Sequence, residues 1–116
     1  MKNFCFPLIL LVSVISIIGC ASISELRSDG TSDIWYSEKS VDDVSQCILF
    51  GWQDRKMLIG TMNVYIQPYV NGQTVYTEDN TFVSDIISYN GKTKISYYHQ
   101  NEARNDEMKG IILNCI

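Results

Sequence analysis

The chain has only one histidine, the residue that most often serves as the general base for a nucleophile. The single histidine, His99, falls at the end of an expected strand, opposite Phe82 if the hairpin there has a two-residue turn. A nucleophilic hydroxyl or thiol needs a positioned base, and a strand-end histidine beside an aromatic ring is better explained as a packing or surface residue. His99 and Glu102 are too few ligands for a metal site.

Phosphate-binding glycine loops and catalytic carboxylate pairs are missing as well. Asp42-Asp43 fit the first turn of an expected helix, and Glu78-Asp79 fit a solvated turn, so neither pair indicates a paired-carboxylate mechanism. The glycines do not form a phosphate loop. They are dispersed along the chain, among them Gly51, Gly60, Gly72 and Gly91. We expect no enzyme, no cofactor and no metal.

Charge is nearly absent from the first twenty residues, where Lys2 stands alone. An apolar stretch from Pro7 to Ile18 follows it, and Gly19 closes the segment. A positive start, an apolar stretch and a small-residue exit are typical of a secretory signal. The stretch is shorter than the roughly 20 apolar residues that a spanning helix needs. An uncleaved anchor or an ordinary signal is the alternative.

The exit Ile17-Ile18-Gly19-Cys20 resembles the lipobox of bacterial lipoprotein precursors. This resemblance covers about the first fifth of the chain. It implies a thioether-linked diacylglycerol on Cys20, cleavage between Gly19 and Cys20, and a fatty acid such as palmitate on the new amino group. Ala21 is not the aspartate that retains such proteins at the inner membrane, so the resemblance implies a periplasmic or surface lipoprotein of the outer membrane. Lipid on Cys20 would give stable membrane anchoring.

Basic side chains are in the minority. The whole chain has a net charge of −4, and residues 20–116 alone hold all thirteen acidic side chains against eight of the nine basic ones. This balance argues against nucleic acid or anionic headgroups as a partner.

Few cysteines are expected to remain after processing. If the resemblance holds, Cys5 leaves with the signal and Cys20 carries lipid, so Cys47 and Cys115 are left as an even pair in an oxidising compartment. A disulfide is the expectation, and closing a loop of this length would stabilise the fold by about 4 kcal/mol. Two free thiols are the alternative; zinc is disfavoured because neither cysteine has a second ligand at metal spacing.

The pattern divides the chain into a signal peptide (1–19), a lipidated cysteine with a polar, serine-rich tether (20–32) and a globular domain (33–116). The domain opens with a strand candidate, Asp33–Ser37. Ser40 then caps a helix expected to end near Gln53, because apolar residues recur at helical spacing from Val41 onward.

Two Asn-Gly dipeptides predict two hairpins. Strands around Met62–Val70 and Gln73–Thr77 flank Asn71-Gly72, and strands Phe82–Tyr89 and Lys92–Tyr98 flank Asn90-Gly91. Pro68 has no N–H to donate, which places its strand at a sheet edge or a bulge. A four-stranded antiparallel meander is the economical assembly.

The tail has apolar residues at Met108, Ile111, Ile112 and Cys115, which favours a helix, although Gly110 leaves an edge strand open. A helix would put Cys47 and Cys115 on inward stripes. The expected fold is therefore an α+β two-layer sandwich of strand, helix, four strands and helix. This element order resembles the TATA-binding-protein-like fold, which also occurs in domains of outer-membrane assembly lipoproteins.

Alternation along the hairpins assigns the two faces of the sheet. Met62, Val64, Ile66, Val75, Phe82, Ile86, Ile95 and Tyr97 share the face expected to lie under the helices. The opposite face, expected to be uncovered, carries tyrosines among polar residues, namely Tyr65, Tyr69, Tyr76, Tyr89 and Tyr98. These rings suit another envelope protein or peptidoglycan and other surface glycans; the alternative is that tyrosine is simply a good strand residue.

Overall fold

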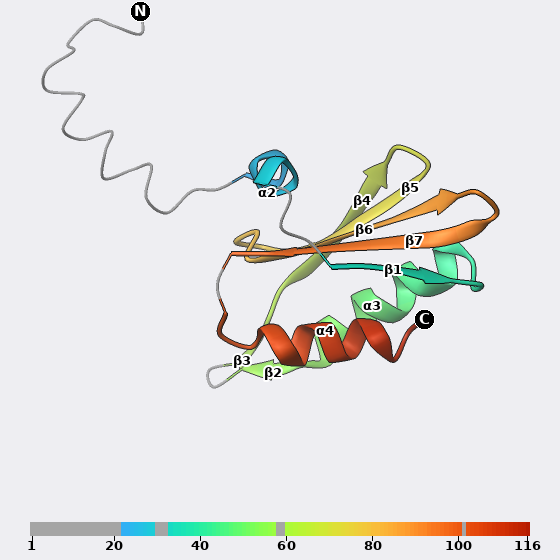
Figure 1. Cartoon of the computed structure of the whole chain (residues 1–116). Coiled ribbons are helices and arrows are strands. Elements are labelled where there is room, and N and C mark those ends of the chain that lie inside the picture. The colour runs from blue at the N-terminus through green and yellow to red at the C-terminus, as the bar shows by residue number, and fades with distance from the viewer. Residues whose placement is uncertain (1–21, 30–32, 58–59, 101) are drawn as a thin grey trace, which may run out of the picture.

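The computed structural model describes residues 22–29, 33–57, 60–100 and 102–116. A five-stranded antiparallel sheet forms its middle layer, with strand order β1-β7-β6-β5-β4. Helices α3 and α4 cover one face, and the short helix α2 lies on the other (Figure 1). The predicted α+β fold is confirmed. The helices are α2 (Ile23–Asp29), α3 (Val41–Asp54) and α4 (Asn105–Leu113).

The strands follow the predicted order along the chain. Within the sheet they are β1 (Asp33–Ser37), β4 (Val64–Tyr69), β5 (Gly72–Thr77), β6 (Phe82–Tyr89) and β7 (Lys92–His99). β2 (Lys56–Met57) and β3 (Gly60–Thr61) form a separate two-stranded ribbon. Pro68 lies in β4, which is an edge strand, as its missing N–H predicted.

Helix α3 begins where the sequence places its cap. Ser40 Oγ accepts a hydrogen bond from the Asp43 N–H at 3.0 Å, and the acidic side chains of the first turn favour the positive end of the helix dipole. Its inward stripe is buried against the sheet and includes Val44, Ile48 and Trp52. Capping and periodicity together therefore explain this helix.

The tail is a helix, which settles the choice that the sequence left open. Asn105 is the first helical residue, but its side chain accepts a hydrogen bond from the buried Tyr97 hydroxyl at 2.7 Å instead of capping the helix. Arg104, just before it, is in the left-handed region with φ 65°. Gly110 is tolerated in the helix interior, and nothing lies within 4 Å of the position that a Cβ would take there.

The two hairpin turns differ. Asn90-Gly91 connects Tyr89 to Lys92, and both turn residues have positive φ, as predicted. In the other hairpin the turn was predicted at Asn71-Gly72, and this position is wrong by one residue. Tyr69 pairs with Gly72, so Val70-Asn71 forms the turn and only Asn71 has positive φ.

Gly72 has a different role from the one predicted. It belongs to β5, and a Cβ built on it would lie 2.0 Å from the Ile86 carbonyl oxygen of β6. The residue is therefore needed for close strand approach rather than for a positive φ. The register shift is two residues, so every side chain keeps the face that alternation assigned to it.

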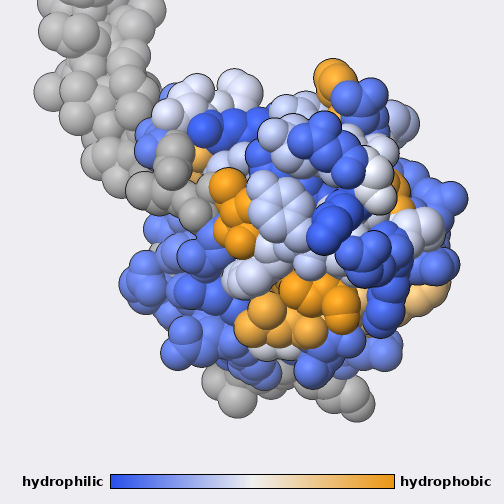
Figure 2. Space-filling view, turned by 45° about the vertical axis from the view of Figure 1, so that its right-hand side comes forward, coloured by the Kyte–Doolittle hydropathy of each residue, from blue (hydrophilic) through white to orange (hydrophobic). Residues whose placement is uncertain are grey.

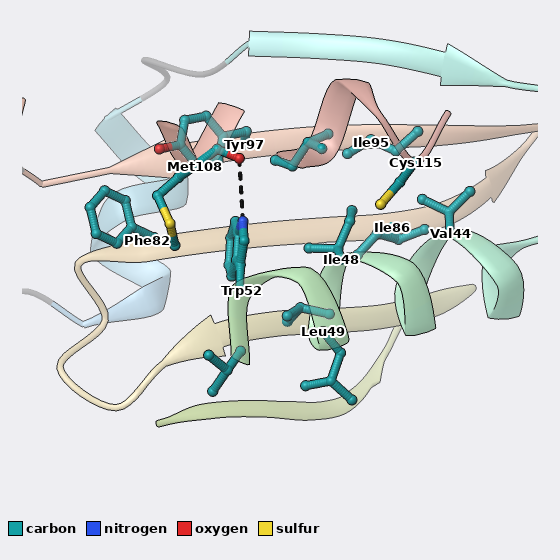
Figure 3. Close-up of a cluster of buried hydrophobic side chains, with 13 residues drawn as sticks. Val44, Ile48, Leu49, Trp52, Phe82, Ile86, Ile95, Tyr97, Met108 and Cys115 are labelled. Atoms are coloured by element: carbon teal, nitrogen blue, oxygen red, sulfur yellow. Dashed lines mark hydrogen bonds between the residues drawn. The ribbon is translucent and has the colours of Figure 1, made fainter. Parts of the chain in front are cut away.

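The core fills the space between the sheet and the helix pair (Figure 3). Trp52 of α3 donates its indole N–H to the Met108 carbonyl of α4 at 3.3 Å. Tyr97 of β7 lies beside Trp52, with ring centroids 6.3 Å apart in an edge-on arrangement. The sheet contributes the apolar side chains predicted for its inner face, among them Val64, Val75, Phe82, Ile86 and Ile95.

The predicted disulfide joins the two helices on that face. Cys47 of α3 and Cys115, just after α4, are bonded, with their Cα atoms 5.7 Å apart. Cys115 is buried, but Cys47 is exposed, so the expectation that both lie on inward stripes is wrong for Cys47. Cys47 lies on the side of α3 that faces α4 and not the sheet.

Candidate binding face

Strand register defines the face opposite α3 and α4. Alternate residues of each strand point to it, and six of the chain's seven tyrosines do so. We call this surface the tyrosine face. Its tyrosines are Tyr36, Tyr65, Tyr69, Tyr76, Tyr89 and Tyr98. The seventh, Tyr97, lies in the core.

The tyrosines of this face are unequally exposed. Tyr65 is 46% exposed and Tyr89 is 44% exposed, whereas Tyr69, Tyr76 and Tyr98 are half-buried. Tyr65 and Tyr76 are directly opposite one another on β4 and β5, and their ring centroids are 5.7 Å apart. The five predicted residues thus share a face, but two of them offer most of the free area.

Tyr36 of β1 was missing from the predicted set. It is 51% exposed, and its ring centroid lies 6.3 Å from that of Tyr89. Sequence reasoning assigned faces only to the hairpin strands, and pairing of β1 with β7 is not visible in a local pattern. Alternation within Asp33–Ser37 nevertheless separates Tyr36 from its neighbour Trp35, which packs against the core.

The centre of the tyrosine face is covered, in contrast to the expected open surface. Within the stretch interpreted as a tether, residues 23–29 form α2, which lies on this face (Figure 1). Leu26 is its buried apolar residue. The serine-rich composition concealed this helix, although Ser22 and Glu25, three residues apart, were an available capping signal.

Arg27 attaches α2 to the sheet. Its Nε and Nη2 atoms each donate to a carboxylate oxygen of Asp85 at 2.8 Å, and Nη2 also donates to Thr74 Oγ1 at 3.0 Å. The guanidinium carbon lies 4.0 Å from the centroid of the Tyr69 ring. A planar cation with several donors fits this carboxylate, hydroxyl and ring as a set.

The electrostatics around Arg27 fit an ion pair that is partly shielded from water. The Asp85 side chain is 6% exposed and that of Arg27 is 23% exposed. Hydrogen bonding to Asp85 raises the pKa of Arg27, so the guanidinium keeps its charge. Burial raises the pKa of Tyr98, and the charge of Asp85 adds to the effect.

Two lysines sit at the end of the face away from Tyr65. Lys94 Nζ lies 4.9 Å from the centroid of the Tyr89 ring, an arrangement in which a cation is attracted to the ring's negative face. Lys92 Nζ lies 3.2 Å from the Glu38 carboxylate. In the side that Figure 2 shows, apolar residues gather in one compact area and in isolated spots within a largely hydrophilic surface.

The predicted non-catalytic residues have structural contacts. His99 pairs with Phe82, as expected, and stacks on Tyr97 with ring centroids 5.6 Å apart. Its Nε2 atom lies 2.8 Å from a Glu102 oxygen.

Asp79 accepts hydrogen bonds from the Thr77 hydroxyl and the Thr81 N–H, which fixes the turn after β5. Within residues 22–29, 33–57, 60–100 and 102–116 no group of three His, Cys, Asp or Glu side chains is arranged to hold a metal.

The predicted cleavage and lipidation residues, Gly19 and Cys20, lie outside the described residues. Among the helices that are described, none is both long and apolar enough to cross a membrane. Comparisons with protein-family models, with curated proteins and with solved structures gave no match.

Proposed function

We propose that this chain is a non-catalytic, lipid-anchored envelope protein that binds another envelope protein through the tyrosine face. The observation that carries the proposal is a pair of ring clusters, Tyr65 with Tyr76 and Tyr36 with Tyr89. They lie on the same face as a helix that begins three residues after the expected lipidation residue. Tyrosine rings supply contact area with little side-chain entropy to lose, which is why they are enriched in binding surfaces.

The lipid anchor is supported by the lipobox resemblance and, weakly, by the Cys47–Cys115 disulfide, since such bonds persist in oxidising compartments. The proposed location is the outer membrane. Mass spectrometry of the protein purified from membranes tests this part. The expected species begins at Cys20 with acyl chains attached, and a Cys20→Ser variant is expected to be absent from the membrane fraction. Intact residues 1–19 would contradict the proposal.

Binding is tested by removing the exposed rings and comparing with a matched aromatic on the other layer. The triple variant Tyr36→Ala, Tyr65→Ala and Tyr89→Ala is expected to lose a co-purifying partner. Phe50→Ala is the control, because Phe50 belongs to α3, on the opposite side of the sheet from the tyrosine face, and is 55% exposed. Recovery of the same partner by the triple variant, with both variants folded, would refute the proposed face.

A surface glycan is the second candidate ligand, since the adjacent Tyr65 and Tyr76 rings lie on and beside the edge strand β4, where a polymer can approach from the side. Sedimentation of the purified protein with isolated peptidoglycan separates the two candidates, because glycan binding needs no partner protein. Tyr65→Ala is expected to reduce sedimentation if the glycan is the ligand.

A further inference from the structure

Helix α2 begins at Ile23, three residues after Cys20 in the sequence. The Ser22 N–H donates to Glu25 Oε1 at 2.8 Å, and the Glu25 N–H donates to Ser22 Oγ at 3.2 Å. These reciprocal bonds form a capping box, which fixes the first turn of the helix. Only Ala21 separates the capped helix from Cys20 in the sequence.

The other end of α2 is fixed to the sheet. Leu26 is buried, and Arg27 makes its two bonds to Asp85 on β6, the central strand. The helix that follows the expected lipid is therefore held on the tyrosine face, while α3 and α4 cover the opposite face (Figure 1).

We infer that the tyrosine face is turned toward the bilayer and that its partner is an integral membrane protein contacted at the level of the lipid headgroups. This inference rests on the proposed lipidation of Cys20. From Ser22 back to Cys20 the chain spans at most roughly 7 Å. A helical layer alone is about 10 Å thick, so the anchor cannot pass around the sheet and place α3 and α4 against the membrane.

The charges of the face favour a protein over the lipid surface itself. Its cations already have partners: Arg27 binds Asp85, Lys92 pairs with Glu38, and Lys94 lies over Tyr89. Binding to anionic headgroups needs clustered, available cations, whereas residues 20–116 have an acidic excess. Exposed Tyr36, Tyr65 and Tyr89 instead suit an aromatic and polar protein surface near the interface.

Photocrosslinking in the full-length, processed protein tests the inference. A benzophenone amino acid is placed at Tyr65, at Tyr89 or, as the matched control, at Phe50 on the far layer. After irradiation of intact cells, the partner in each adduct is identified by mass spectrometry, and carbonate extraction of unirradiated membranes shows whether that free partner is integral. The probes at Tyr65 and Tyr89 are expected to give adducts with an integral membrane protein, several-fold more than the probe at Phe50. In an Arg27→Ala background this preference is expected to shrink, because α2 no longer fixes the face.

Each other outcome overturns the inference. Equal adducts from Phe50 and Tyr89 would show that the face has no preferred orientation. A crosslinked partner whose free form is extracted by carbonate from unirradiated membranes would be peripheral, and adducts with phospholipid alone would identify the bilayer as the occupant. Mass spectrometry of Cys20 in the same samples separates the two levels: unlipidated Cys20 refutes the proposed function, whereas lipidated Cys20 with any of these crosslinking results refutes only the orientation and partner.

Discussion

At Gly72 the backbone of β5 comes closer to β6 than any side chain permits. A Cβ at this position would lie 2.0 Å from the Ile86 carbonyl oxygen and 2.7 Å from the Ile87 Cα, both of them backbone atoms that cannot rotate away. Gly72→Ala is therefore expected to lower the free energy of unfolding by about 2 kcal/mol, the scale of an overpacked core. Urea unfolding followed by tryptophan fluorescence measures the change.

Gly110 provides the opposite case. It lies within α4, and nothing is within 4 Å of its would-be Cβ. Gly110→Ala is expected to raise the free energy of unfolding by up to about 1 kcal/mol, because alanine loses less backbone entropy in a helix. If Gly72→Ala raises the urea midpoint as Gly110→Ala is expected to do, or leaves it unchanged, the assignment of Gly72 to a close strand contact is wrong.

Single residues show what the sequence can predict and why it fails elsewhere. Ser40 and Asn90-Gly91 act through neighbours in the chain, and the structure has the cap and the turn that they predict. The role of Gly72 was predicted wrongly because its constraint comes from β6, where its paired residue Ile87 is fifteen positions away in sequence. Local turn chemistry could not reveal that contact.

Among the elements, α2 depends on one ion pair more than on its own helical propensity. A seven-residue helix is marginal in isolation. Arg27→Ala removes the charge that balances the nearly buried Asp85, so we expect a loss of about 2 kcal/mol, less than for a fully buried pair because Arg27 is partly exposed. Amide hydrogen exchange at Leu26, whose N–H donates to the Ser22 carbonyl at 3.1 Å, is expected to accelerate.

The double variant Arg27→Ala with Asp85→Asn serves as the control for that prediction. It removes both charges, so it is expected to be more stable than Arg27→Ala alone. If the two variants are equally stable, Arg27 holds α2 through its stem and its contact with Tyr69 rather than through Asp85.

The disulfide links α3 to the end of α4 across 68 positions of sequence. Replacing Cys47 and Cys115 with alanine is expected to lower the free energy of unfolding by about 4 kcal/mol, because the unfolded chain regains the entropy that the closed loop removed. Thermal unfolding of the variant measures this loss. Reduced wild-type protein is expected to match the variant, and a clear difference between them would show that the alanines act through packing.

Some helices and strands could be predicted from the sequence and others could not. Helix α3 and the four hairpin strands follow from periodicity and turn residues. The face assignments survived the misplaced turn because a two-residue shift leaves alternation unchanged. Helix α2 and the place of Tyr36 in the tyrosine face were not predicted, because both depend on tertiary contacts. Helix α2 is held by Asp85, and Tyr36 lies beside Tyr89 across β7.

For the whole molecule, Tyr97 sets an upper pH limit to stability. Burial raises its pKa well above the ordinary value of 10.0, and the charges of Asp33, Glu102 and Asp106 add to the effect. Above pH 10 the unfolded chain releases this proton while the folded protein retains it, so the folded state binds more protons and stability falls as pH rises. Chemical unfolding between pH 7 and 11 is expected to show this decline.

Tyr97→Phe is the control for the pH dependence. It is expected to cost about 1 kcal/mol at pH 7, where Asn105 loses the hydroxyl that it accepts from. Its stability is then expected to decline less steeply above pH 10. Some slope is expected to remain, because the pKa of Tyr98 is also raised. A decline identical to that of the wild type would mean that Tyr97 is not the titrating group.

The strand order also constrains when the domain can form. Within the sheet β1 pairs only with β7. In the sequence, helix α3 and the strands β2 to β6 lie between these two strands. During synthesis β1 therefore has no pairing partner until nearly all of the domain has been made. Cys47 likewise cannot form its disulfide until Cys115 is present. If the protein is exported as proposed, folding and oxidation follow translocation rather than accompany it, and the interval after export is then the period in which a chaperone or an oxidase can act on it.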